Sequence, residues 1–122
     1  MKILRTPDEC FDNLEDYPFE PNYIDIEHDD QTLRMHFLDE NSGSEEIVLL
    51  MHGEPTWSYL YRKIIPILVS NGKRVIAPDL IGFGKSDKPS SREDYSYANH
   101  IMWVETLIKK LDLKNIIFFA QD

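Results

Sequence analysis

The sequence has 122 residues, with 13 Lys and Arg against 22 Asp and Glu, so its formal net charge is −9. This balance argues against nucleic-acid binding through a basic face, and a hydrophobic content of 42% is typical of a folded globular chain. The apolar runs, such as residues 47–51, are too short to span a membrane. The single cysteine, Cys10, fits a reducing compartment. We therefore expect a one-domain cytoplasmic protein with neither nucleic-acid nor membrane partners.

The charge is distributed unevenly along the chain. Residues 1–46 contain 14 acidic and 3 basic residues, whereas residues 47–122 contain 8 acidic and 10 basic residues. The acidic half could bind a cationic partner, but its acids alternate with strand-like apolar residues instead of forming a block. This pattern favours a solvated outer face.

The first half of the sequence predicts an irregular leader followed by a hairpin. Residues 1–22 are rich in Asp, Glu, Pro and Asn and contain scattered aromatic residues. Residues 23–28 and 33–38 alternate between apolar and polar positions, and Asp29 and Asp30 form a turn between them. Such alternation indicates two strands that are buried on one side only.

The middle of the chain predicts strand, helix and strand. Residues 47–51 are apolar on both faces, as a central strand covered by helices on both sides requires. Residues 57–70 have a helical composition, and we expect Pro66 to kink or divide that segment. Residues 74–77 form a second short strand before Pro78.

The last third predicts a loop over residues 79–89, a helix over residues 96–111 and a strand over residues 115–120. Hairpin, strand, helix, strand, helix and strand together indicate an α/β fold with a largely parallel sheet. In such sheets, chemistry gathers beyond the carboxyl ends of the central strands. Residues 52–54 and residues 121–122 both lie at such ends. The expected helix has one apolar side, made of Ile101, Val104, Leu107, Ile108 and Leu111.

The sequence ends at Asp122, directly after its most apolar strand. A strand that is apolar on both faces belongs inside a sheet, because a free hydrophobic edge invites aggregation. Either a partner chain completes the sheet or the chain is the front part of a longer protein. We expect the second arrangement.

Several blocks of the sequence resemble haloalkane dehalogenases of the α/β-hydrolase superfamily. The most specific block is His-Gly-Glu-Pro-Thr-Trp-Ser-Tyr-Leu-Tyr-Arg-Lys at residues 52–63, in register with residues 74–79 and 82–89. Parts of the leader and of residues 111–116 are similar too, so the resemblance spans the whole chain. It implies that residues 1–122 form the N-terminal part of an α/β-hydrolase main domain, with an antiparallel N-terminal hairpin. The cap domain and the C-terminal part would be absent.

The resemblance also implies a site and a reaction. In this family an elbow after a sheet strand carries an Asp nucleophile, and Gln121-Asp122 matches its first two positions. Asp122 would displace a halide from a small haloalkane, and water would hydrolyse the resulting ester without a metal or another cofactor. Glu54 would supply an oxyanion-hole N–H and help to position that water. His52 and Gly53 would hold the loop in shape, and the general base would lie beyond residue 122.

Other interpretations remain open. An epoxide hydrolase shares the Asp nucleophile, although its turn usually carries Phe after His-Gly, where this chain has Glu54. The chain could also be a non-catalytic partial domain, and we expect it to be inactive by itself. Glu54 could be an ordinary surface acid. Residues expected to be surface or structural rather than catalytic are His28, His36 and His100, and residues expected to pack in the core are Trp57, Tyr59 and Tyr61.

Overall fold

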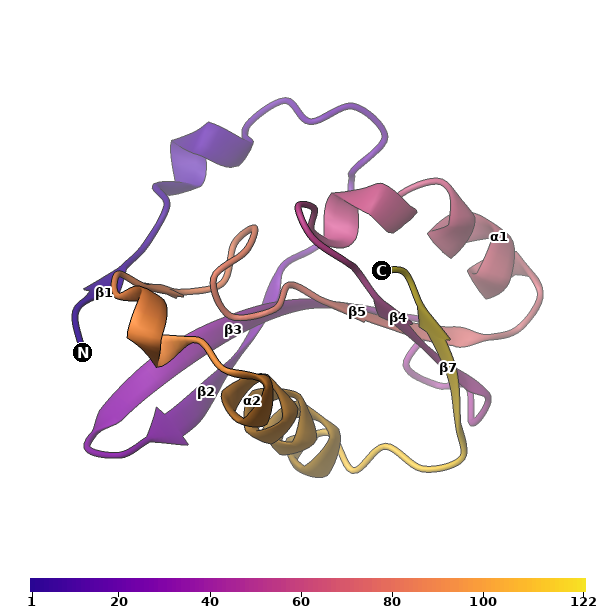
Figure 1. The fold of residues 1–122 in the computed structure, drawn as a ribbon. Helices are drawn as coiled ribbons and strands as arrows, with labels where there is room; N and C mark the ends of the chain where they lie inside the picture. Colours follow the sequence, from indigo (N-terminus) through magenta and orange to yellow (C-terminus); the bar gives the residue numbers. More distant parts are fainter.

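The computed structural model describes all 122 residues, which form seven strands and two α-helices (Figure 1). The strands are β1 (Ile3–Leu4), β2 (Asn22–His28), β3 (Gln31–Glu40), β4 (Ile47–Met51), β5 (Arg74–Pro78), β6 (Lys88–Pro89) and β7 (Ile116–Ala120). The helices are α1 (Ile64–Ser70) and α2 (Tyr97–Lys110), and short 3₁₀ turns cover Asp8–Phe11, Ser58–Tyr61 and Arg92–Asp94.

Five strands form the main sheet in the order β2-β3-β5-β4-β7. The strands β5, β4 and β7 are parallel to one another, as expected for a strand–helix–strand–helix–strand chain. The expected hairpin of β2 and β3 is confirmed. The expected burial on one side only is wrong for β3, because His36 and Leu38 are buried as completely as Met35 on the other face. β3 also pairs antiparallel with β5, so the sheet is mixed and β3 is covered on both faces. Figure 1 shows α1 and α2 on opposite faces of this sheet.

Side chains of the central strand β4 pack in both hydrophobic cores, because successive side chains along a strand point to opposite faces of the sheet. Ile47 and Leu49 pack in the core beneath α2, which includes Trp103 and Leu107. Val48 and Leu50 pack in the core beneath α1. These four side chains of β4 are buried and Met51 is partly buried, which confirms the prediction of a central strand covered on both sides.

The leader and the region around Pro66 differ from expectation. Residues Ile3–Leu4 form a strand, β1, that pairs with β6, a long-range contact without a local sequence pattern. The predicted break in residues 57–70 occurs before Pro66, between Tyr61 and Ile64. Pro66 lies in the first turn of α1, where a backbone N–H has no intrahelical partner to lose and proline is tolerated.

Helix α2 has its expected position, but its apolar side is divided between two environments. Trp103 and Leu107 are completely buried in the core. Ile101, predicted to lie on the buried side, is 49% exposed and faces an open apolar hollow. Ser96 is the N-cap of the helix, and its hydroxyl oxygen accepts a hydrogen bond from the Asn99 N–H at 3.0 Å.

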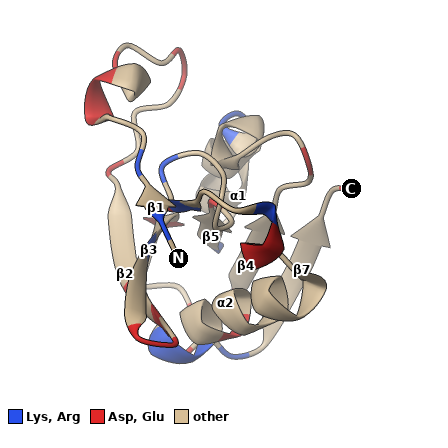
Figure 2. Cartoon of the chain, turned by 60° about the vertical axis from the view of Figure 1, so that its left-hand side comes forward, with Lys and Arg blue, Asp and Glu red and all other residues tan.

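The strand β7 forms one edge of the main sheet, because it pairs only with β4. Ile117, Phe118 and Phe119 are between 50% and 59% exposed, so both faces of this strand contain uncovered apolar surface. No helix is long and apolar enough to cross a membrane. Figure 2 shows that acidic residues gather along the leader and at the turn between β2 and β3, on the outside of the molecule.

Candidate functional site

The turn after β4 and the end of β7 meet at one edge of the sheet. The two strands are parallel and in register, with Met51 opposite Ala120, so both carboxyl ends point the same way. The N–H of Gln121 continues the ladder by donating to the Met51 carbonyl oxygen at 3.1 Å. The strand β4, which leads into the turn, therefore holds β7 in place, and the predicted nucleophile, Asp122, comes two residues after the end of β7.

Gly53 allows the closest approach between these two segments. A Cβ atom added at Gly53 would lie 2.4 Å from the backbone carbonyl carbon of Asp122 and 2.5 Å from the carbonyl oxygen of Gln121. Both distances are far below an ordinary van der Waals contact, so only glycine fits here. The structure thus places the Gly53 backbone directly against the backbone of Asp122.

Glu54, the next residue, is exposed at the edge of a hollow of about 380 Å³. The peptide bond from Glu54 to Pro55 is cis. Asp122 does not line this hollow, so the turn and Asp122 meet through their backbones and not through a cavity shared by their two carboxylates. The other lining residues are Gly82, Phe83, Arg92, Tyr95 and His100.

His52 is buried, and both of its ring nitrogens are engaged. Its Nε2 accepts a hydrogen bond from the Leu80 N–H at 2.9 Å, and its Nδ1 lies 2.9 Å from the Gly53 carbonyl oxygen. This arrangement suits a neutral ring that donates through Nδ1, and burial lowers the pKa of His52. Such a ring has no free nitrogen for a substrate, and its two hydrogen bonds connect the turn to Leu80.

A buried polar pair, His36 and Asp79, lies behind the turn. The Nδ1 atom of His36 is 2.8 Å from Oδ2 of Asp79, and both side chains are inaccessible to solvent. Burial raises the pKa of the Asp79 carboxyl, but hydrogen bonds from His36 and from the N–H groups of Lys85 and Ser58 outweigh it and lower that pKa. Of the two roles expected for His36, surface or structural, the structural one is correct. Asp79 was expected only to belong to a loop.

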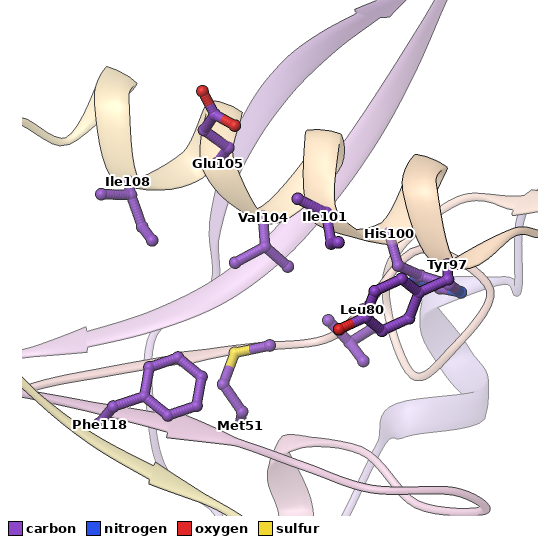
Figure 3. A pocket seen from close by; sticks show the side chains of 9 residues that line it. All are labelled: Met51, Leu80, Tyr97, His100, Ile101, Val104, Glu105, Ile108 and Phe118. Atoms are coloured by element: carbon purple, nitrogen blue, oxygen red, sulfur yellow. The ribbon is translucent and has the colours of Figure 1, made fainter.

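His100, at the start of α2, lies between two hollows. It lines the hollow of Glu54 and also an apolar hollow of about 420 Å³ between α2, β4 and β7. Figure 3 shows Ile101 and Val104 pointing across that apolar hollow toward Met51 and Phe118. Burial, and secondarily the nearby His52, lower the pKa of His100. The sequence offered no motif around this histidine.

The other aromatic and histidine side chains act in packing. Trp57 and Tyr59 stack with ring centroids 5.5 Å apart, and Tyr61 is buried in the core beneath α1, as expected. His28 accepts a hydrogen bond of 3.4 Å from the indole N–H of Trp103. No group of three or more His, Cys, Asp and Glu side chains is arranged to hold a metal ion.

A mixed sheet whose strands β5, β4 and β7 are parallel, with helices on both faces and the candidate residues beyond the carboxyl ends of β4 and β7, is typical of the α/β-hydrolase fold. The family model for the alpha/beta hydrolase fold matches residues 46–122, and the chain belongs to this family. Within it, the resemblance to haloalkane dehalogenases is confirmed over the full length of the chain.

Three relatives illustrate this resemblance. A haloalkane dehalogenase of Psychrobacter cryohalolentis is 57% identical over the whole chain, which spans 41% of the relative's length. The tetrameric haloalkane dehalogenase DpaA of Paraglaciecola agarilytica NO2 is 50% identical, with a TM-score of 0.95 over 100% of this chain and 41% of that one. The haloalkane dehalogenase DatA of Agrobacterium tumefaciens C58 is 34% identical, with a TM-score of 0.68 over 84% of this chain and 33% of that one.

Proposed function

We propose that this chain forms the nucleophile-bearing part of a haloalkane dehalogenase, which converts small haloalkanes and water into alcohols and halide ions. The observation that carries the proposal is the contact between the Gly53 backbone and the Asp122 backbone. It brings the expected nucleophile to the turn that carries the expected oxyanion-hole residue, Glu54. The chain spans 41% of the length of the Psychrobacter cryohalolentis relative and of DpaA, so the general base and the halide-binding groups are expected from other segments.

The first step of the proposed reaction uses the Asp122 carboxylate as the nucleophile, since a carboxylate, unlike a serine hydroxyl, needs no base to remove a proton. One carboxylate oxygen attacks the carbon that bears the halogen. The carbon–halogen bond breaks, the halogen leaves with the bonding electron pair as a halide ion, and an alkyl ester forms on Asp122. No metal, nucleotide or oxygen is needed.

In the second step water attacks the carbonyl carbon of that ester and passes a proton to a general base. The oxyanion that develops on the aspartyl carbonyl needs preplaced N–H donors, and the turn at Glu54 lies against Asp122. The ester C–O bond then breaks, and the departing alkoxide takes up the remaining proton of the attacking water and leaves as the alcohol. The base releases its proton to solvent, and the carboxylate is regenerated. The exposed Glu54 carboxylate would help to position that water, as the resemblance implies. The free Cys10 accords with a reducing cytoplasm as the place of this reaction.

A chimera tests the proposal directly. Residues 1–122 replace the matching 41% of the Psychrobacter cryohalolentis relative, whose remaining sequence supplies the other segments. We expect halide release from 1-bromobutane, and an alkyl-enzyme adduct in mass spectra after rapid quenching. Asp122→Asn should abolish both, because a neutral amide is a poor nucleophile. Asp112→Asn, at an exposed residue with positive φ, is the matched control and should keep both.

Two further arms separate the alternatives. Adduct formation in the Asp122→Asn chimera would refute Asp122 as the nucleophile. If the unmodified chimera opens styrene oxide but releases no halide, the epoxide hydrolase is correct, although Glu54 after Gly53 and the named relatives favour the dehalogenase. The 122-residue chain alone should release no halide above background.

A further inference from the structure

The turn that carries Glu54 is tied at both ends to two consecutive residues. At its start, His52 Nε2 accepts the N–H of Leu80 at 2.9 Å. At its end, the N–H of Ser58 donates to Oδ1 of Asp79 at 2.7 Å. Residues 53–57 therefore lie between two hydrogen bonds, one to the N–H of Leu80 and one to the carboxylate of Asp79. We call this pair of hydrogen bonds the clamp.

The Asp79 carboxylate is held by several other groups. Its Oδ2 accepts hydrogen bonds from His36 Nδ1 at 2.8 Å and from the Lys85 N–H at 2.9 Å. The side chain of Ser86 donates to the Asp79 carbonyl oxygen at 2.6 Å. Since Asp79 is fully buried, these bonds fix its position against three separate segments: β3, the loop of residues 80–87 and the turn.

The leader, residues 1–22, also contacts Ser58 at the end of the turn. Tyr17 is buried, and its hydroxyl lies 2.6 Å from Oγ of Ser58. Desolvation raises the pKa of Tyr17, so its hydroxyl stays protonated at neutral pH. Ser58 is therefore held through its side chain by Tyr17 and through its backbone by Asp79.

We propose that Asp79 is a positioning residue for Glu54: together with the adjacent Leu80 N–H, its carboxylate closes the turn and sets the place of the Glu54 backbone relative to Asp122. An asparagine cannot replace it. Three donors converge on the two carboxylate oxygens, so the amide NH₂ would face at least one of them. This inference rests on the proposed function, since Glu54 is expected to act on the aspartyl ester.

The chimera described above provides the kinetic test, because its two half-reactions can be timed separately with 1-bromobutane and rapid quenching. Asp79→Asn should slow hydrolysis of the alkyl-enzyme at least ~10-fold, less than the ~10²-fold to ~10³-fold cost of removing an oxyanion-hole donor, because the donor is displaced and not lost. The rate at which Asp122 is alkylated should change less than ~3-fold. The alkyl-enzyme should therefore accumulate.

Asp87→Asn is the matched control. Asp87 is also buried in the same loop, but its carboxylate binds Arg5 and the Arg34 N–H and does not touch the turn. This variant should lower the melting temperature without changing the ratio of the two rates. If Asp79→Asn lowers both rates by one common factor, or Asp87→Asn shifts their ratio equally, the positioning role is refuted.

A second pair of variants guards against failure of Asp79→Asn to fold. Ser58→Pro removes the N–H that donates to Asp79, at the first residue of a 3₁₀ turn that follows an extended residue. Ser58→Ala removes only the bond to Tyr17. We expect the alkyl-enzyme to accumulate in Ser58→Pro and not in Ser58→Ala, and the reverse pattern would overturn the inference.

Amide hydrogen exchange tests the clamp independently of activity. The Leu80 N–H bonds to His52 and not to the Asp79 side chain. It should lose protection in Asp79→Asn and Ser58→Pro but keep it in Asp87→Asn. Unchanged protection of Leu80 refutes the clamp. A chimera that releases no halide refutes the proposed function alone, since the exchange result still stands.

Discussion

Gly53→Ala tests the central contact of the site. The added Cβ would lie 2.4 Å from the Asp122 carbonyl carbon and 2.7 Å from its carbonyl oxygen, and both atoms belong to the backbone. A flexible side chain could swing away, but a strand end cannot. The substitution therefore has to push the turn and Asp122 apart.

The size of the effect follows from the contact distances. Ordinary van der Waals contact begins near 3.4 Å, so the two segments must separate by about 1 Å. A misplacement of about 1 Å in an active site can cost ~10²-fold in rate, which corresponds to about 2.7 kcal/mol of transition-state stabilisation. Overpacking of this kind should also destabilise the fold by about 1–3 kcal/mol.

The assay is halide release from 1-bromobutane by the chimera of residues 1–122 with the Psychrobacter cryohalolentis relative, measured well below the melting temperature. Gly43→Ala is the control, because a Cβ at Gly43 meets nothing within 4 Å. We expect kcat to fall by ~10²-fold in Gly53→Ala and to change less than twofold in Gly43→Ala. If Gly53→Ala retains at least half of the activity, the close approach is not required and the reasoning is wrong.

Three further predictions concern the fold. Ser96→Ala should lower the free energy of unfolding by about 1 kcal/mol, because it removes the N-cap of α2; urea unfolding checks this, with the exposed Ser90→Ala as control. Burial raises the pKa of the Asp87 carboxyl, but Arg5 and the Arg34 N–H outweigh it and lower that pKa, so its stabilisation is present above the unfolded value near 3.9 and lost as the pH falls through the folded value. The stability difference between the unmodified protein and Asp87→Asn should therefore shrink as the pH is lowered from 6 toward 2, and a constant difference would contradict this. The 122-residue chain alone should self-associate through the free edge of β7, and Ile117→Lys should reduce the association; a monomer by light scattering at micromolar concentration would contradict this.

The sequence predicted most of the elements of the main sheet, because their signals are local. The apolar run of residues 47–51 identifies one strand, and the alternation in residues 23–28 and 33–38 identifies two more, without knowledge of their partners. The strand β1 could not be found this way, since Ile3 and Leu4 are extended only by their pairing with β6, more than eighty residues away. The Pro66 prediction failed because a proline breaks the interior of a helix but is accepted in its first turn.

The apolar pattern of α2 shows a different limit of sequence analysis. Periodicity identifies which residues share one side of a helix, but it does not say what covers them. Trp103 and Leu107 are buried by the sheet, whereas Ile101 faces the open hollow beside Phe118. These environments differ because Trp103 and Leu107 lie over the middle of the sheet, whereas Ile101 lies toward its edge strand, β7.

The position of the candidate site also depends partly on local sequence patterns and partly on contacts between distant residues. Glu54 and Asp122 could be assigned to one edge of the sheet because both follow parallel strands, and carboxyl ends of parallel strands meet at the same edge. What holds them there is distant in sequence: Asp79 is 43 residues from His36 and 21 from Ser58, and Tyr17 is 41 from Ser58. A buried carboxylate is tolerated only where enough hydrogen-bond donors converge on it. A buried Asp79 in a loop of glycines and serines therefore indicates that several donors surround it. The sequence does not show which N–H groups donate to this carboxylate, because those donors are distant in the chain. The structure shows that one of them is the N–H of Ser58, at the end of the turn that carries Glu54.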